Sequence, residues 1–331
     1  MKICFLDKTH FTYTFKDKYS EKLRGAETAL INLSSALYRL GHEITVFNNC
    51  LEEFNQSNFS WLNINRLNKK RFYFDVAISN NNVNLLDNII CKKKFVWSHS
   101  VYTIEKFFRK RQFFSYLKNK PTYLLLGNYH NEKMSKLFKL FGTKIIDYGL
   151  DEKFLKTKIN ENLESSQSIF FSRNDRNLDK LIEIWKEKIK PKLNQAKLLI
   201  TPKKNKSLRN FNIIDRELGN QQKLINDLLE SKLALIPGHK AELYCLAAEE
   251  AKELCLPIVS FGIGSLKERV KHNHDGLIAK NDDEFSKYVV DIYNNKGLWL
   301  ELRKNLINSR GKKSWKTAAI RFINVISNSN E

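Results

Sequence analysis

Two glutamates eight positions apart, Glu242 and Glu250, have the type and spacing that most clearly suggest chemistry in this chain. The first follows an apolar segment and a Pro-Gly turn, and the second lies on a segment with the pattern of a helix. Because an ionised carboxylate accepts two hydrogen bonds from a vicinal diol, a carboxylate at the start of a helix suits a ribose. A solvated helix face is the alternative, since Glu249 and Glu253 are also charged.

A glycine turn at Gly264 and Ser265 follows the next apolar segment, residues 258–261, and precedes a short helical pattern. Backbone N–H groups at such a turn can bind phosphate, because the start of a helix carries unpaired donors and a partial positive charge. A simple connecting turn is the alternative interpretation.

Two arginines, Arg173 and Arg176, come directly after the strand expected at 168–172. A guanidinium group grips phosphate through two hydrogen bonds and keeps its charge, so this pair suits a diphosphate. The alternative is an exposed basic loop in a basic protein.

Two further positions precede or follow expected elements of the first half. Gly25, in the run Arg24-Gly25-Ala26-Glu27 before the first long helix, allows a backbone to approach a ligand, while Glu27 favours the helix dipole. His99 follows the strand at 94–97, where an imidazole can orient a hydroxyl group or a sugar; a purely structural histidine is the alternative.

Aromatic and basic residues alternate at helical spacing over residues 106–118. This pattern predicts one helix, which either lies in an anionic membrane interface or packs on the core with a solvated basic back. The sequence leaves both interpretations open.

Strand and helix patterns alternate along the chain, which predicts two Rossmann-like, doubly wound parallel sheets. Ligands of such sheets bind at the carboxyl ends of the strands, where the residues above are expected. A polar segment at 155–167 predicts the linker between the halves. The expected strands are 3–6, 43–47, 74–78, 94–97, 122–126, 168–172, 197–200, 233–236 and 258–261, and the expected helices include 27–40, 178–189 and 222–229.

Charge and cysteine content restrict the partners and the compartment. The 57 Lys and Arg against 36 Asp and Glu give a net charge of +21, which favours phosphorylated small molecules, acidic lipid surfaces or nucleic acid. A compositional bias toward Lys, Asn and Ile is an alternative source of the excess. The five cysteines are scattered without a CxxC pair, and no long apolar run occurs, so we expect a cytoplasmic protein without disulfides or zinc.

In chain order these motifs resemble a retaining glycosyltransferase of the GT-B fold, family 4. Residues 24–27 resemble its GGxE loop, with Arg24 in place of the first glycine, and residues 147–151 resemble the Asn-Gly-Val-Asp stretch at the domain junction. Residues 171–177 resemble its donor-phosphate motif, residues 242–250 its E-x7-E motif, and Trp315 the tryptophan before its closing helix.

The resemblance implies two Rossmann-like domains facing a central cleft. Residues 1–155 would bind the acceptor, 156–312 the donor, and 313–331 would return to the first domain as a helix. The implied catalytic residues are His99 and Glu242. The implied donor-binding residues are Gly25, Ala26, Arg173, Arg176, Glu242, Leu246, Glu250, Gly264 and Ser265.

The implied activity is transfer of a sugar, with retention, from a nucleoside-diphosphate-sugar to a lipid-linked or saccharide acceptor in cell-envelope polysaccharide or glycolipid synthesis. The chain has no DxD motif, so we expect no metal cofactor, with Arg173 and Arg176 neutralising the phosphates. We expect a cytoplasmic enzyme, peripheral to the inner face of a membrane if residues 106–118 bind lipid. A nucleotide-sugar epimerase of the same fold is one alternative. A non-enzymatic nucleic-acid-binding protein is the other, and the absence of any nucleic-acid motif argues against it.

Overall fold

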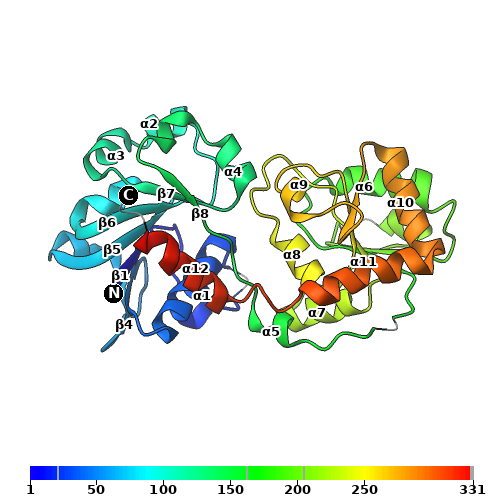
Figure 1. Ribbon diagram of the computed structural model, residues 1–331, viewed down its shortest axis with the longest axis horizontal. Helices are drawn as coiled ribbons and strands as arrows, with labels where there is room; N and C mark the ends of the chain where they lie inside the picture. Colours follow the sequence, from blue (N-terminus) through cyan, green and yellow to red (C-terminus); the bar gives the residue numbers. More distant parts are fainter. Residues whose placement is uncertain (21, 162, 204–205, 329–331) are drawn as a thin grey trace. The chain divides into compact units, whose positions relative to one another are not determined.

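The computed structural model describes residues 1–331 except 21, 162, 204–205 and 329–331 (Figure 1). The chain forms two compact units: unit 1 comprises Met1–Gly149 with Lys313–Glu331, and unit 2 comprises Leu150–Lys312. The first boundary therefore falls before the predicted linker at 155–167.

Unit 1 is built on an eight-stranded sheet, counted over the described residues, with strand order β3-β4-β2-β1-β5-β6-β7-β8. All neighbouring strands are parallel except β3 and β4, and the central strands are buried because helices cover both faces of such a sheet. The strands are β1 (Lys2–Leu6), β2 (Glu43–Asn48), β3 (Phe54–Gln56), β4 (Phe59–Asn63), β5 (Phe72–Asn80), β6 (Ile89–Trp97), β7 (Thr122–Leu125) and β8 (Thr143–Ile145).

The last helix of the chain packs in unit 1. Phe322 of this helix stacks near Phe5 of β1, with ring centroids 6.4 Å apart, and Lys93 Nζ donates to the carbonyl oxygens of Ile326 and Ser327. The α-helices of this unit are α1 (Gly25–Arg39), α2 (Ile104–Arg109), α3 (Phe113–Asn119), α4 (Asn128–Lys133) and α12 (Trp315–Ser327). Short 3-10 turns are η1 (Phe15–Asp17), η2 (Ile64–Asn68), η3 (Val83–Asn88) and η4 (Lys136–Lys139).

Unit 2 holds a six-stranded sheet in its described part, with order β11-β10-β9-β12-β13-β14 and every pair parallel. The strands are β9 (Gln167–Phe170), β10 (Lys197–Ile200), β11 (Ile213–Asp215), β12 (Leu233–Leu235), β13 (Ile258–Ser260) and β14 (Gly276–Ile278). The helices are α5 (Glu152–Lys156), α6 (Leu178–Ile184) with a π turn η5 (Trp185–Ile189), η6 (Lys206–Phe211), α7 (Gln221–Leu229), α8 (Leu246–Glu253), α9 (Leu266–Arg269), α10 (Asp282–Asn294) and α11 (Lys296–Ser309).

The two parallel, Rossmann-like sheets confirm the predicted fold class. The single helix predicted over 106–118 is wrong, because α2 ends at Arg109 and α3 begins at Phe113. Arg111 adopts φ +52° between them, and buried Gln112 accepts a hydrogen bond from Val83 N at 3.2 Å. This turn between α2 and α3 places the Gln112 side chain within hydrogen-bonding distance of Val83.

Candidate functional site

Glycines allow two turns of unit 2, after β12 and after β13, to pack with their backbones in direct contact. Gly238 (φ +92°) and Gly264 (φ +73°) both adopt the left-handed conformation. A Cβ on Gly264 would overlap the carbonyl oxygen of His239, and Ser265 N donates to the Glu242 carbonyl at 3.0 Å. Only glycine allows this close approach without strain, so the sequence forces the two turns together at the carboxyl edge of the sheet.

Glu242 lies in the first of these turns; the residue as a whole is half-buried, and its Oε2 atom is buried. Its Oε2 atom has no hydrogen-bond partner among the described residues, although the buried Cys245 thiol hydrogen-bonds to the carboxylate. Burial raises the pKa of Glu242, while Cys245 and the charges of Arg176 and Arg173 act in the opposite direction. The site therefore holds an oxygen that a ligand hydroxyl or amide can satisfy.

Arg173 and Arg176 follow β9, and their charges reach Glu242. Both pair with Asp175 Oδ2, at 2.5 Å for Arg173 and 3.1 Å for Arg176, and their side chains are 74% and 15% exposed. Asn177 (φ +63°) donates from Nδ2 to the Gly238 carbonyl, which ties this loop to the turn after β12. The fold thus brings the arginines beside Glu242, with a carboxylate that an anionic ligand can displace.

Glu250 lies on α8, one turn after Leu246, so both project from the same side of the helix. Burial, and then the charge of Asp151, raise the pKa of Glu250 to about 8. Asp151 itself caps α5 by accepting from Lys153 N at 3.0 Å. Glu250 is consequently protonated at neutral pH in the ligand-free protein.

In unit 1, His99 lies at the end of β6 in a cage of aromatic and amide groups. Its Nδ1 is 2.5 Å from the Tyr148 hydroxyl, its Nε2 is 3.3 Å from Asn80 Oδ1, and its ring is 4.6 Å from that of Trp97. Burial, and then His130, lower the pKa of His99 to about 3. The imidazole is therefore neutral and acts through hydrogen bonds rather than as a cation.

The sequence analysis did not identify Asp7, Asn80 and Tyr148 as site residues, yet they lie around His99 and Glu27. Tyr13 Oη donates to Asp7 Oδ2 at 2.8 Å, and burial raises the pKa of Asp7 to about 6, with Asn80 and Glu27 also acting on it. Asp7 directly follows β1, which was the available signal. Tyr148 lies in the stretch 147–151, which resembles the domain-junction motif, but the sequence indicated no role for Tyr148 itself.

At the start of α1, Glu27 Oε2 accepts from Arg24 N at 3.1 Å, so this glutamate caps the helix. Gly25 is exposed, and a Cβ added to it would meet nothing within 4 Å. Ala26 is half-buried. The fold itself does not require glycine at position 25. The absence of a side chain there leaves room for a ligand.

Of the predicted site residues, Arg173, Arg176, Glu242, Gly264 and Ser265 are brought together in unit 2. Leu246 and Glu250 follow on the adjoining helix α8, and Gly25, Ala26 and His99 belong to unit 1. Within the described ranges, no three His, Cys, Asp or Glu side chains are grouped so as to hold a metal ion. All five cysteines are free thiols, and none of the described helices is both long and apolar enough to cross a membrane.

Comparison with known proteins identifies the second unit. Residues 151–313 match the family model described as glycosyl transferases group 1. Unit 2 is therefore a glycosyl transferases group 1 domain. No curated protein matches the chain.

Solved glycosyltransferases share the fold of the whole chain. Sucrose-phosphate synthase from Thermosynechococcus elongatus aligns with TM-score 0.69 at 12% identity, over 99% of this chain and 98% of that chain. WaaG, a glycosyltransferase involved in lipopolysaccharide biosynthesis, aligns with TM-score 0.68 at 13% identity, over 98% and 100%. Anabaena HepE, solved in complex with UDP, aligns with TM-score 0.69 at 15% identity, over 99% and 100%. These similarities confirm the GT-B fold of this chain.

Proposed function

We propose that this glycosyltransferase is a family 4 enzyme that moves a sugar, with retention of configuration, from a nucleoside-diphosphate-sugar to a lipid-linked or saccharide acceptor. The observation that carries the proposal is the group in unit 2: two arginines beside Glu242, whose Oε2 has no partner, between two turns closed by glycines.

The donor diphosphate is bound by Arg173 and Arg176. Both guanidinium groups now share Asp175, and a diphosphate offers more charge and more acceptor oxygens than one exposed carboxylate. Negative charge grows on the leaving diphosphate as the glycosidic bond breaks, so fixed cations there stabilise the transition state. We expect no metal ion to be needed for this charge.

The turn at Gly264 and Ser265 contributes one backbone donor to this site. Ser265 N is bonded to the Glu242 carbonyl at 3.0 Å, so Ser265 holds the turn in place. Gly264 N–H is the backbone donor that we assign to the phosphate. Glu242 Oε2 accepts from a hydroxyl group of the donor sugar.

Glu250 binds the ribose, with Leu246 beside it on α8. A ribose diol donates best to an ionised carboxylate, so binding favours the deprotonated form of a group whose pKa is about 8 in the free protein. Nucleotide binding at neutral pH therefore releases a proton.

Unit 1 supplies the acceptor site. His99 is neutral and fixed by Tyr148, so it orients a hydroxyl group of the reacting sugar. Gly25 and Ala26 leave space for the donor phosphates at the start of α1. UDP is the first nucleotide to test, since HepE was solved with it.

With a lipid-linked or saccharide acceptor, the proposed role of the enzyme is in cell-envelope polysaccharide or glycolipid synthesis. It works on the cytoplasmic side, peripheral to the membrane when the acceptor is lipid-linked. Enzyme incubated with UDP-, GDP- and ADP-sugars, with and without a mixed saccharide and lipid-linked acceptor pool, tests the activity. We expect nucleotide release only with acceptor, and an anomeric NMR signal in the product that matches the donor. An epimerised sugar without acceptor, or an inverted product, would contradict the proposal.

A further inference from the structure

Apolar side chains project into solvent from both α2 and α3. Phe114 is 81% exposed and Phe108 is 50% exposed, and both lie against the ring of Phe113, with centroids 5.8 and 5.2 Å away. The exposed side chains, which we call the α2–α3 ridge, are Ile104, Phe108, Phe114 and Leu117. Phe107 and Tyr116 of the same two helices are fully buried, so the helices are anchored and hold the ridge side chains outward.

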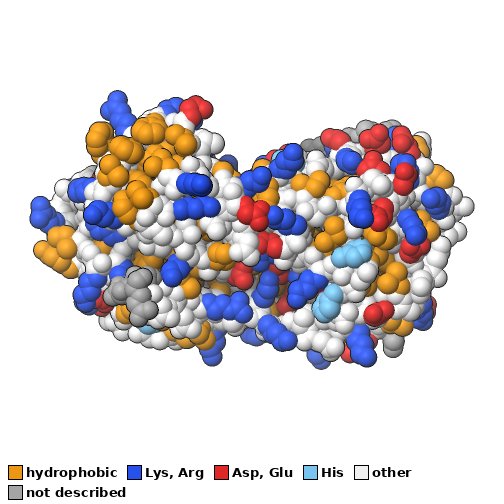
Figure 2. Space-filling view, turned by 45° about the horizontal axis from the view of Figure 1, so that its top comes forward, with side chains coloured by type: hydrophobic (Ala, Val, Ile, Leu, Met, Phe, Trp, Pro, Cys, Tyr) orange, Lys and Arg blue, Asp and Glu red, His pale blue; other side chains and the backbone are white. Residues whose placement is uncertain are grey.

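Cations surround this ridge, and three of them have no carboxylate partner among the described residues. Lys106, Lys110 and Arg111 form no ion pair with any described residue. Arg109 pairs with exposed Glu105 at 3.5 Å, a contact of little energetic weight in water. Hydrophobic and basic side chains gather together on this part of unit 1 (Figure 2).

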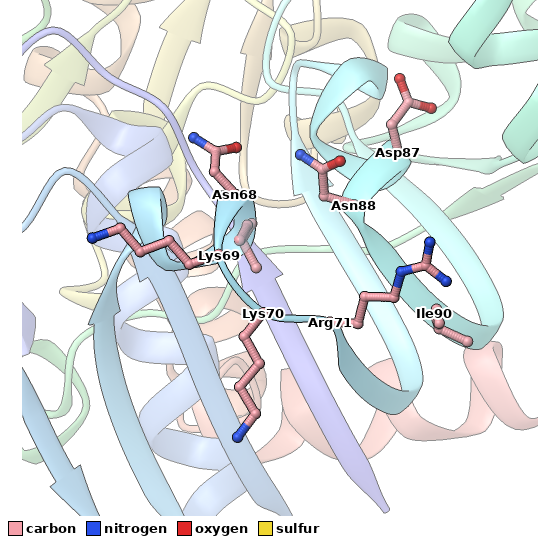
Figure 3. A pocket seen from close by; sticks show the side chains of 8 residues that line it. Asn68, Lys69, Lys70, Arg71, Asp87, Asn88 and Ile90 are labelled. Atoms are coloured by element: carbon pink, nitrogen blue, oxygen red, sulfur yellow. The ribbon is translucent and has the colours of Figure 1, made fainter.

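A basic pocket of about 610 Å³ adjoins the ridge, at the amino ends of β5 and β6. Lys69, Lys70 and Arg71 line it and form no ion pair with the described residues. Arg71 extends toward Ile90, while Lys69 and Lys70 extend in other directions (Figure 3). The pocket therefore presents unpaired positive charge at the surface.

One carboxylate, Asp87, connects the pocket to α3. Asp87 lines the pocket and accepts hydrogen bonds from Ser115 Oγ at 2.5 Å and Asn119 Nδ2 at 2.7 Å. Lys118 of α3 also pairs with it, at 3.6 Å. The ridge and the pocket are thus neighbouring parts of unit 1, joined through a short network.

The chemistry of this surface limits its occupant. A second copy of the chain would bring the six unpaired cations of one surface against those of the other, which repel. A nucleic acid would use the aromatic rings for stacking but has no use for exposed Ile104 and Leu117. Acyl chains accept all four ridge side chains, while anionic headgroups match the cations.

We propose that the α2–α3 ridge and the adjoining basic pocket dock unit 1 onto an anionic lipid bilayer. The ridge enters the interface between headgroups and acyl chains, and the cations lie at the level of the lipid phosphates. This inference deepens the proposed function. The link to a lipid-linked acceptor rests on that function, whereas binding to the bilayer rests on the surface residues alone. Each unpaired cation near the bilayer strengthens partitioning about fivefold, and salt weakens it.

Vesicle co-sedimentation of the full chain tests the docking. Wild type should sediment with mixed phosphatidylglycerol and phosphatidylcholine vesicles, and much less with phosphatidylcholine alone. Neutralising Lys106, Lys110 and Arg111 to Gln should weaken partitioning about 100-fold, the product of three such steps. The exposed lysines of unit 2, Lys271, Lys287 and Lys304, changed to Gln as a matched control, should leave it nearly unchanged.

A second pair of variants tests the ridge at constant charge. Phe108→Ser with Phe114→Ser should reduce partitioning at least tenfold, because the ridge then loses its two exposed aromatic rings. Leu218→Ser with Leu300→Ser, two exposed leucines of unit 2, should not. Equal losses in variants and controls would overturn the proposal, as would a wild type that fails to sediment or that dimerises through the ridge.

Binding of UDP, GDP and ADP by thermal shift, measured on the same samples, separates this proposal from the function. Vesicle binding without nucleotide binding would contradict the function and leave the docking standing. Nucleotide binding without vesicle binding would do the reverse.

Discussion

Replacing Glu250 by Gln should change how the stability of the protein depends on pH. The pKa of Glu250 is raised from 4.5 to about 8, so between these values the folded chain keeps a proton that the unfolded chain has lost. Unfolding then releases a proton, and the free energy of unfolding falls as pH rises through this window. Stability from this group is fully present below pH 4.5 and is lost as pH passes 8.

The shift sets the size of the effect. Each pKa unit corresponds to about 1.4 kcal/mol, which gives at most about 5 kcal/mol across the window. Gln is uncharged at every pH, so Glu250→Gln should gain about 3.5 kcal/mol over wild type between pH 5 and pH 8.

Urea unfolding of both proteins at pH 5, 6.5 and 8 measures this difference. Other groups titrate in the range, including Asp7 with a pKa of about 6, but they are common to both proteins and cancel. Glu301→Gln, on the exposed face of α11, is the matched control and should follow wild type. Wild type and Glu250→Gln curves that stay parallel across this range would refute the assigned environment of Glu250.

Three further outcomes follow from the site. UDP binding at pH 7 should release close to one proton in wild type and none in Glu250→Gln. Calorimetry in buffers of different ionisation enthalpy measures this release. Equal proton release in both proteins would exclude Glu250 as the ribose ligand. Activity should survive EDTA, and its complete loss with rescue by Mn²⁺ or Mg²⁺ would show that Arg173 and Arg176 do not suffice. Gly264→Ala should destabilise unit 2 by about 2–4 kcal/mol in thermal unfolding, because φ is +73° and the Cβ meets a carbonyl oxygen; an unchanged Tm would contradict the described turn.

The sequence was sufficient to predict the central strands of both sheets, because these strands are buried on both faces. β10 occupies the predicted residues 197–200, and its apolar run has no competing pattern. β3 and β8 were missed because each has three residues and mostly exposed side chains. The helix pattern over 106–118 was real, but Gln112 turns the chain between α2 and α3, and no local periodicity reports a distant partner such as Val83.

The site was predictable where residue type and strand position agree. Arg173, Arg176 and Glu242 follow strands, and the fold brings their charges together. Cys245 gave no such signal, because a cysteine with φ +55° that bonds to Glu242 depends on how α8 meets the turn before it. The cage around His99 was equally hidden, since Asn80 and Tyr148 come from separate parts of unit 1.

Calorimetric titration of nucleoside diphosphates, UDP first, into wild type and Arg176→Ala tests the central claim most directly. Loss of a charged hydrogen bond to phosphate should cost about 1.5–3 kcal/mol, or about 10- to 150-fold in Kd, with Lys186→Ala on the π turn as control. Arg173→Ala should behave in the same way. A wild type that binds no nucleoside diphosphate, or an affinity unchanged in both arginine variants, would contradict the donor site.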